Sequence, residues 1–195
     1  MKTRMLYTIM NIPRVFIVLP VYALMSPNRK SIVKADIDRY SFMTGKIKSY
    51  WFKLAFLLVN NRAFRNIYER RITGVGRYWT QLWFRPMESL EIGNNIGPGL
   101  CVYHGYATVI QANSIGSQCS IWQNVTIGRR PQRGHIIDAP TIGNDVKVYT
   151  GAIVIGDIKV GNNVSIGAGS VVIKDVPDNA IVVGNPARIV GYNKT

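Results

Sequence analysis

The chain has 195 residues, 47% of them hydrophobic, so it can bury a core in one domain or in a small domain joined to a larger one. This composition excludes a disordered tail. The two cysteines, Cys101 and Cys119, are too few for a disulfide framework or a cysteine metal cage. We interpret them as reduced thiols, which fits a cytoplasmic location.

The formal net charge of +14 is unevenly distributed. Residues 1–88 hold 16 Lys or Arg and 4 Asp or Glu, a net charge of +12, whereas residues 89–195 hold 8 and 6, a net charge of +2. Charge alone is compatible with nucleic-acid binding, but the chain carries no recognised nucleic-acid motif and its composition changes sharply near residue 89. We therefore expect no nucleic-acid partner.

Residues 5–25 form a strongly apolar stretch with basic residues in and beside it. A membrane-spanning helix needs about 20 uninterrupted apolar residues, and here Pro13, Arg14 and Pro20 interrupt the run. No small-residue cleavage site of a signal peptide follows it. Two interpretations stay open: an interfacial anchor that gives peripheral membrane contact, or packing against the rest of the protein or a partner subunit.

Helical periodicity follows, and it predicts a short helix over residues 31–40 and a long one over residues 50–71. Gly74 and Gly76 break the pattern, and the periodicity changes after Pro86. We therefore divide the chain into a basic, partly apolar helical region, residues 1–88, and a second domain, residues 89–195.

In the second domain aliphatic residues recur every six positions, with Gly, Asn and Asp between them. A period of six fits neither a helix nor an antiparallel strand, but it fits a triangular solenoid in which three hexads make one coil. The aliphatic side chains then form ladders inside the core. The repeat positions are Leu90, Ile96, Val102, Val109, Ile115, Ile121 and Ile127, then Ile142, Val148, Val154, Val160, Ile166 and Val172.

The segment between Ile127 and Ile142 is too long for the plain repeat. It contains Arg129, Arg130 and His135, among other polar residues. We predict that residues 129–140 form a loop extruded from the solenoid.

Four motifs carry a resemblance to a known family: GPGLCVYHG at 97–105, QNVTIG at 123–128, IGAGSVV at 166–172 and GNPARIVG at 184–191. Residues 90–191 resemble the catalytic domain of the serine acetyltransferase branch of hexapeptide-repeat acyltransferases. The likeness is greatest to branch members among the capsule and exopolysaccharide acetyltransferases. It implies a mainly β fold, a left-handed parallel β-helix, here preceded by the small α-helical region. It also implies a homotrimer with active sites between neighbouring solenoids and acetyl-CoA as co-substrate.

His104 occupies the position of the family's catalytic histidine. The chemistry supports this role independently, because an imidazole that titrates near neutrality can take a hydroxyl proton as the oxygen attacks a thioester. The alternative is a structural histidine beside a turn glycine. The family's orienting Asp aligns with Ser89, and Glu88 and Glu91 are the candidate substitutes.

The resemblance places acetyl-CoA along the later coils. Small residues there let the backbone approach the cofactor, and basic side chains could meet its phosphates; the alternative is ordinary solenoid turns and solvated charges. The candidate cofactor residues are Thr150, Gly151, Ala168, Gly169, Lys174 and Arg188.

The sequence departs from the serine-specific pattern in the acceptor pocket. Tyr103 replaces an Asp immediately before the catalytic histidine, and residues 138–140 read Asp-Ala-Pro where an Arg-His-Pro holds the amino acid's carboxylate. A pocket without these charged partners discriminates poorly for a small zwitterion. We therefore expect a sugar hydroxyl of a capsular, exopolysaccharide or lipopolysaccharide glycan or its precursor as acceptor, with these candidate contacts: Tyr103, Tyr106, Trp122 and His135.

Three other functions compete with this reading. Serine O-acetylation in cysteine biosynthesis is supported by the catalytic motif and weakened by the changed pocket. A metal-dependent hydratase on the same solenoid needs three histidine ligands, and the chain has only His104 and His135, so we expect no metal. A non-catalytic scaffold is the last alternative, because a fold does not guarantee an activity.

Overall fold

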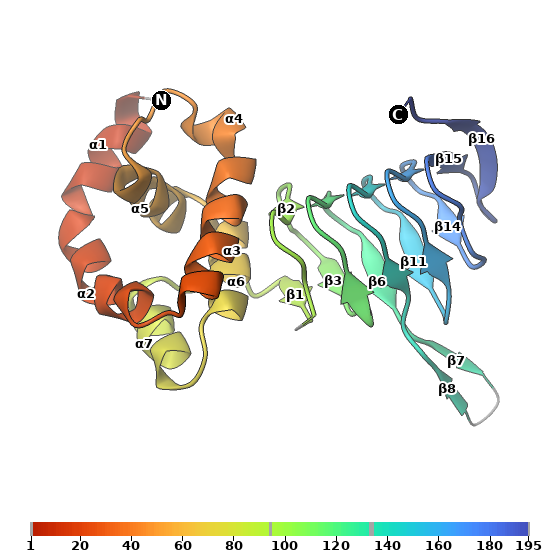
Figure 1. Cartoon of the computed structure of the whole chain (residues 1–195), viewed down its shortest axis with the longest axis horizontal. Coiled ribbons are helices and arrows are strands. Elements are labelled where there is room, and N and C mark those ends of the chain that lie inside the picture. Colours follow the sequence, from red (N-terminus) through yellow and green to blue (C-terminus); the bar gives the residue numbers. More distant parts are fainter. Residues whose placement is uncertain (1, 94, 133–134, 195) are drawn as a thin grey trace. The chain divides into compact units, whose positions relative to one another are not determined.

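The computed structural model describes residues 2–93, 95–132 and 135–194, without the side chains of residues 131–137. The chain divides into two compact units, Met1–Met87 and Glu88–Thr195. The first is helical and the second consists of short strands, as Figure 1 shows. Each unit is described by itself.

The helices of the first unit are mostly short and joined by tight turns (Figure 1). Within the described residues no single helix is both long and apolar enough to cross a membrane; α1 and α2 meet the criteria only as a pair, which is bent by 69°. The helices are α1 (Lys2–Met10), α2 (Ile12–Ala23), α3 (Pro27–Arg39), α4 (Ser41–Thr44), α5 (Tyr50–Asn60), α6 (Arg62–Arg71) and α7 (Val75–Trp83).

Side-chain caps decide where these helices begin. The predicted helix over residues 31–40 begins earlier, at Pro27, because Ser26 caps it and proline favours the first helical turn. The single long helix predicted over residues 50–71 is wrong. Asn61 adopts an extended conformation, with φ −129°, and its Oδ1 accepts a hydrogen bond of 2.9 Å from the Phe64 amide. The chain therefore ends α5 and starts α6 at this residue.

The core of the helical unit lies around α5 and α6. Leu54, Leu57, Phe64 and Ile67 are fully buried. The same region also buries an ion pair, because Arg71 Nε donates a 2.8 Å hydrogen bond to Asp36 Oδ2. Two helices of the unit are thus joined by a charged contact beside an apolar core.

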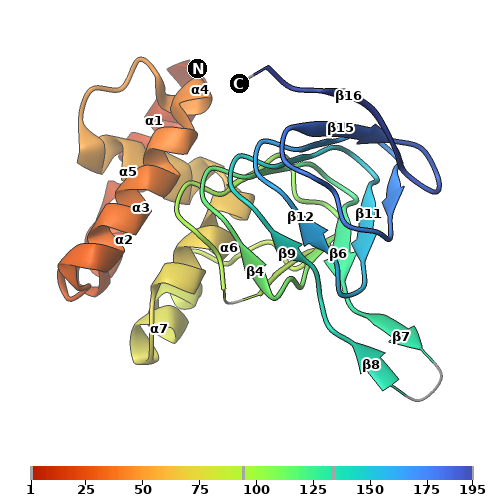
Figure 2. The ribbon, with the colours of Figure 1, turned by 45° about the vertical axis from the view of Figure 1, so that its right-hand side comes forward.

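The second unit is a parallel β-helix, which confirms the predicted fold (Figure 2). Its strands stack in three parallel sheets, which are the three sides of the solenoid. One side holds β1 (Leu90–Ile92), β3 (Thr108–Ile110), β6 (Thr126–Gly128), β11 (Ile153–Ile155) and β14 (Val171–Val172). The second holds β2 (Cys101–Val102), β5 (Ser120–Ile121), β10 (Lys147–Val148), β13 (Ser165–Ile166) and β15 (Ala180–Val183). The third holds β4 (Ser114–Ile115), β9 (Thr141–Ile142) and β12 (Lys159–Val160).

Strand register corrects two of the predicted core positions. Ile110 pairs with Ile127 and is buried, whereas Val109 pairs with Thr126 and is only half-buried. Likewise Ile92, rather than Leu90, lies opposite Ile110, although both β1 residues are buried. The repeat assigned from sequence therefore slips in the first coil.

One corner of the solenoid explains the recurring Gly-Asn pairs. Asn144 Oδ1 accepts from the Ser117 amide at 2.8 Å, and Asn162 Oδ1 accepts from the Asn144 amide at 2.9 Å. Side-chain oxygens thus satisfy the turn amides of the neighbouring coil. A Cβ on Gly143 would lie 2.6 Å from the backbone of the next coil, so the stacking requires glycine there.

The predicted extruded loop is a hairpin of β7 (Arg130–Gln132) and β8 (His135–Ile137), which leaves the solenoid between β6 and β9 (Figures 1 and 2). At the C-terminal end, β16 (Arg188–Tyr192) pairs antiparallel with β15. This pairing changes the direction of the chain at the last coil and covers the edge of that sheet.

Candidate active site

The turn between β2 and β3 is longer than the equivalent turns of the later coils. The paired residues Val102 and Ile121 start it, and the paired residues Ile110 and Ile127 end it. The chain takes eight positions for this turn in the first coil and six in the second. The two additional residues fall in the stretch that contains His104, so the repeat is broken where the catalytic residue was predicted.

His104 has an unusual backbone conformation. Its φ is 66°, and the next residue, Gly105, has φ 71°. The Gly105 amide donates a 2.8 Å hydrogen bond to the Tyr103 carbonyl, which closes a tight turn. The His104 side chain is exposed. A non-glycine residue held in the left-handed region is energetically costly, and such residues cluster at functional sites.

The candidate orienting acids lie in and just before β1. Glu88 and Glu91 are both exposed. Among the residues described, no hydrogen bond or ion pair joins either carboxylate to His104. The role of these two acids stays a prediction.

Successive coils stack their turns directly beneath the His104 turn, and together these turns form the His104 corner. The Asn124 amide donates to the Tyr106 carbonyl at 2.8 Å, the Gly151 amide to the Gln123 carbonyl at 3.2 Å, and the Gly169 amide to the Thr150 carbonyl at 2.9 Å. Coils in a parallel stack lie about 4.8 Å apart, so the corner extends roughly 14 Å from the first coil to the fourth.

The structure brings four predicted cofactor residues together at this corner, because Thr150–Gly151 and Ala168–Gly169 lie on adjacent coils. Gly151 and Gly169 have φ values of 72° and 67°. A Cβ on Gly169 would meet no atom within 4 Å, so the space beside that turn is open. The corner therefore offers exposed backbone with open space beside it, which suits a long, narrow ligand.

The two predicted phosphate contacts lie elsewhere on the solenoid. Lys174 follows β14, and Arg188 begins β16; both side chains are exposed. Neither belongs to the His104 corner, and their role stays a prediction.

Three aromatic rings stack along the outside of the second sheet, next to the His104 corner. The ring centroids of Tyr103 and Trp122 are 4.5 Å apart with an interplanar angle of 12°, and those of Trp122 and Tyr149 are also 4.5 Å apart. We call these residues the aromatic stack. Tyr149 was not singled out from the sequence, although it directly follows a repeat position, as the other two do.

The remaining predicted acceptor residues lie on two different elements. Tyr106 shares the His104 turn and is 61% exposed. His135 begins β8, where its backbone pairs with Gln132, but its side chain lies outside the described residues. Asp138, which aligns with the carboxylate-binding Arg of the serine-specific pattern, is exposed.

Among the residues described, no group of His, Cys, Asp and Glu is arranged to hold a metal ion.

Comparisons with known proteins agree with this architecture. Residues 139–174 match the family model of the bacterial transferase hexapeptide (six repeats). A protein of Escherichia coli K12 named as a colanic acid biosynthesis acetyltransferase, WcaB, is 45% identical over 101 residues, which are 51% of this chain and 61% of the relative. The serine acetyltransferase of Synechococcus elongatus is 39% identical over 139 residues, which are 68% of this chain and 55% of the relative.

Solved serine acetyltransferases have the same fold. The Neisseria gonorrhoeae enzyme superposes with a TM-score of 0.68 at 27% identity, over 87% of this chain and 68% of that one. A serine acetyltransferase solved as a complex with CoA gives a TM-score of 0.63 at 26% identity, over 85% of this chain and 71% of that one. The chain is thus similar in its hexapeptide repeats to bacterial transferases, and in its fold to solved serine acetyltransferases.

The similarity covers only part of each curated relative. The chain spans 55% to 61% of the length of the two curated relatives described above. The names of these relatives divide between colanic acid biosynthesis and serine acetylation.

Proposed function

We propose that this protein is an acetyl-CoA-dependent O-acetyltransferase in which His104 is the general base. The observation that carries the proposal is the position of His104 at the head of the His104 corner, in a strained turn two residues longer than its equivalents. The two curated relatives described above are both named as acetyltransferases, which supports the reaction class.

In the proposed reaction, His104 takes the proton of an acceptor hydroxyl as the hydroxyl oxygen attacks. Bound acetyl-CoA supplies the activated thioester carbonyl. The acetyl group passes directly to the acceptor, the C–S bond breaks, and the proton held on His104 can pass to the leaving thiolate, so no covalent enzyme intermediate is needed. Glu88 or Glu91 is proposed to orient the imidazole, which requires one of these exposed carboxylates to approach His104.

The His104 corner fits the proposed co-substrate. The space beside Gly169 is open, because glycine has no side chain to fill it. Gly151, one coil earlier, likewise keeps the backbone accessible. The CoA complex of a related fold supports acetyl-CoA as co-substrate. Lys174 and Arg188 are the candidates for phosphate contact, since both are exposed and cationic.

For the acceptor we propose a sugar hydroxyl of a capsular, exopolysaccharide or lipopolysaccharide glycan or its precursor. Aromatic faces and edges bind the apolar faces of sugar rings, and the aromatic stack begins at Tyr103, the residue before His104. Trp122 and Tyr149 continue it along two further coils. The relative named for colanic acid biosynthesis supports a glycan acceptor.

Serine is the second candidate acceptor. It is favoured by the relatives and solved structures named as serine acetyltransferases. It is disfavoured by Asp138 and Tyr103. The carboxylate of serine needs a cationic partner, but the acid Asp138 aligns with that position and is exposed. The ammonium group needs an anionic partner, but the uncharged phenol of Tyr103 replaces the family's Asp.

We further propose a homotrimer in the cytoplasm, where acetyl-CoA is made, with peripheral contact of the helical unit with the inner face of the membrane. The trimer follows from the family resemblance, which puts the site between neighbouring solenoids. The net charge of +12 over residues 1–88 supports attraction to an anionic surface.

The decisive assay measures acetyl transfer from acetyl-CoA by thiol release and by mass of the product, with L-serine and with a panel of sugars and cell-envelope glycans. We expect a glycan to gain acetyl and serine to react poorly. Efficient acetylation of serine would contradict the glycan assignment while leaving the reaction class intact. If no acceptor gives thiol release above the rate without enzyme, the proposed activity itself is contradicted.

A further inference from the structure

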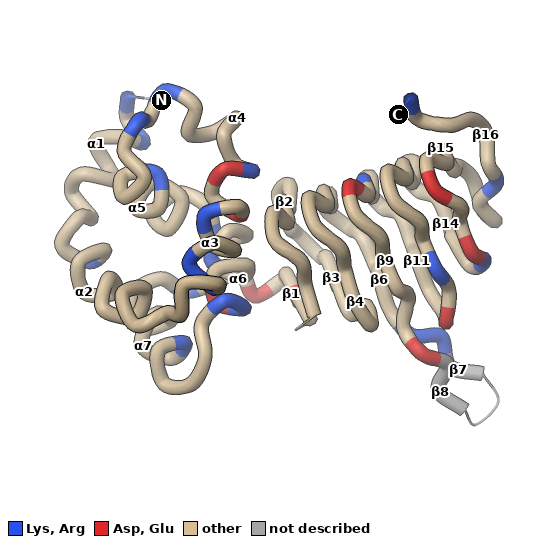
Figure 3. The backbone as a smooth tube through the Cα atoms, in the orientation of Figure 1, with Lys and Arg blue, Asp and Glu red and all other residues tan. Residues whose placement is uncertain are grey.

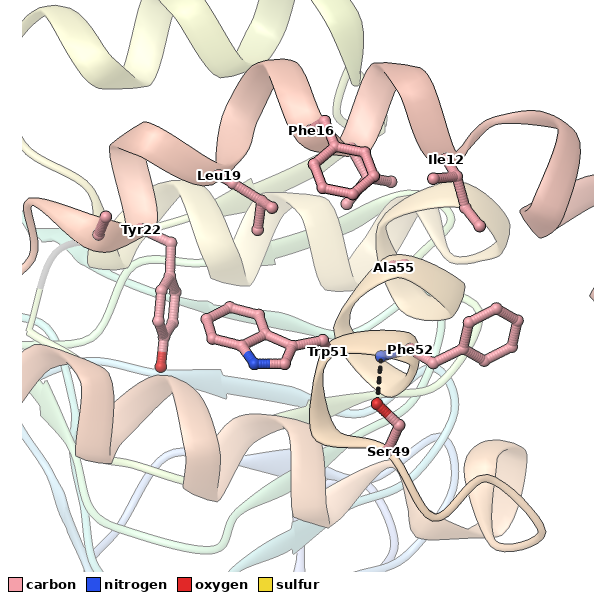
Figure 4. Close-up of a pocket in the computed structure, with 10 residues that line it drawn as sticks. Ile12, Phe16, Leu19, Tyr22, Ser49, Trp51, Phe52 and Ala55 are labelled. Atoms are coloured by element: carbon pink, nitrogen blue, oxygen red, sulfur yellow. Dashed lines mark hydrogen bonds between the residues drawn. The ribbon is translucent and has the colours of Figure 1, made fainter.

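An open apolar groove lies between α2 and α5 of the helical unit, far in sequence from the His104 corner (Figure 4). Its volume is about 540 Å³. Figure 4 shows the side chains of Ile12, Phe16 and Leu19 projecting from α2 toward those of Trp51 and Phe52 on α5. The groove is therefore built from two helices of the same unit, and its walls are hydrocarbon and aromatic.

Several of these apolar side chains are exposed to solvent. Phe16 is 64% exposed and Trp51 is 52% exposed, and on the preceding helix Leu6 and Met10 are 60% and 72% exposed. Large apolar surface is costly in water, and exposed apolar side chains gathered on packed helices, here α1, α2 and α5, mark a site of interaction. The acetyl-transfer mechanism uses none of these residues.

Basic residues lie next to lining residues of the groove. Lys46 and Lys48 are exposed on the segment that leads into α5, and Lys30 Nζ lies 5.8 Å from the centroid of the Tyr22 ring, which lines the groove. Figure 3 shows Lys and Arg distributed over the helical unit.

Negative charge in this unit is largely hidden. Residues 1–87 contain three acids, and two of them, Asp36 and Glu69, are buried. Asp38 is exposed. An apolar groove with lysines beside its lining, in a unit with few exposed acids, is complementary to a lipid bilayer that is apolar inside and anionic at its surface.

We propose that the groove between α2 and α5 binds hydrocarbon chains of an anionic phospholipid bilayer, while the neighbouring lysines contact the lipid phosphates. A volume of about 540 Å³ lies in the range of small-molecule sites. Trp51 at the groove rim suits the membrane interface, where tryptophan is enriched. A second copy of the chain is a poorer occupant, because it brings an equally basic surface and like charges repel. The proposal rests on the proposed membrane contact of the helical unit and is independent of the acetyl acceptor.

The test is co-flotation of the full chain with vesicles of equimolar phosphatidylglycerol and phosphatidylcholine, compared with vesicles of phosphatidylcholine alone. We expect binding to the anionic vesicles that weakens with salt, and about a tenfold loss of partitioning for Phe16→Ser, from the lost burial of one large aromatic side chain. The matched controls are Val75→Ser and Tyr78→Ser on α7, at positions 82% and 69% exposed but outside the groove. They should bind as wild type does.

A second readout places the groove at the hydrocarbon. Phospholipids brominated on their acyl chains should quench tryptophan fluorescence in the wild type, and Trp51→Phe should lose most of that quenching. Equal losses in groove and control variants, absence of binding to anionic vesicles, or quenching unchanged by Trp51→Phe would overturn the proposal. So would a Phe16→Ser variant that binds vesicles normally but sediments as a smaller oligomer, because the groove would then join two copies. Thiol release by Phe16→Ser in solution should equal that of wild type, which separates this test from the proposed activity.

Discussion

Gly169 offers a direct test of the proposed acetyl-CoA channel, which is the open space along the His104 corner beside Gly151 and Gly169. Its φ of 67° lies in the left-handed region, where a side chain costs about 1–2 kcal/mol. A Cβ there meets no atom within 4 Å, so no steric clash adds to this cost. Gly169→Leu should therefore destabilise the fold by about 1–2 kcal/mol while projecting a side chain into the channel. If the leucine side chain removes cofactor contacts worth at least about 1.4 kcal/mol of binding free energy, CoA affinity falls at least about tenfold.

The assay is calorimetric titration of CoA, with urea unfolding measured on the same samples. Gly169→Ala is the matched control for backbone strain, because it adds the same Cβ but does not reach into the channel. Asp145→Leu places leucine on a left-handed turn of another corner, with φ 54°, and should leave CoA affinity unchanged. If Gly169→Leu shows the expected loss of stability but binds CoA as Gly169→Ala does, the channel does not run past this turn.

Three further perturbations test other parts of the account. Trp122→Ala removes two ring contacts worth about 0.5–1.5 kcal/mol each, so urea unfolding should show a loss of about 1–3 kcal/mol, and the KM for the glycan should rise while CoA affinity stays constant. Burial raises the pKa of the Glu69 carboxyl, so its stabilising contribution is complete below its ordinary value of 4.5 and is lost as pH rises through the raised pKa. Unfolding measured from about pH 4 to about pH 8 should therefore show wild type losing stability relative to Glu69→Gln, and a constant difference would contradict this. Asp36→Ala leaves Arg71 without its 2.8 Å partner in a buried site and should cost about 3–5 kcal/mol by the same method, whereas a loss under about 1 kcal/mol would mean that water reaches the guanidinium.

The sequence predicted the solenoid because its determinant is periodic and local. Each hexad contributes one inward aliphatic, and each Gly-Asn turn bonds to the coil beside it, so the pattern repeats in the sequence as in space. The register failed where the repeat is irregular. The long His104 turn shifts the inward position from Val109 to Ile110, and only the pairing of strands reveals that shift.

Other features depended on contacts that sequence spacing does not encode. The break between α5 and α6 depends on one Asn61 cap inside an otherwise helical pattern. Tyr149 joins the aromatic stack because the extruded hairpin, which separates it from Trp122 in sequence, leaves the coils adjacent in space. The apolar groove required α2 and α5 to be brought together, although the apolar stretch that forms one of its walls was visible in the sequence.

The central claim is that His104 acts as general base, and thiol release from acetyl-CoA by a His104→Asn variant tests it most directly. Asparagine tolerates the left-handed conformation, with φ 66°, better than most residues, so this substitution removes the imidazole while keeping the turn. Loss of a general base lowers the rate by about a hundredfold to ten-thousandfold, and we expect that loss at unchanged CoA affinity. A variant that retains the wild-type rate with the same acceptor would contradict the account.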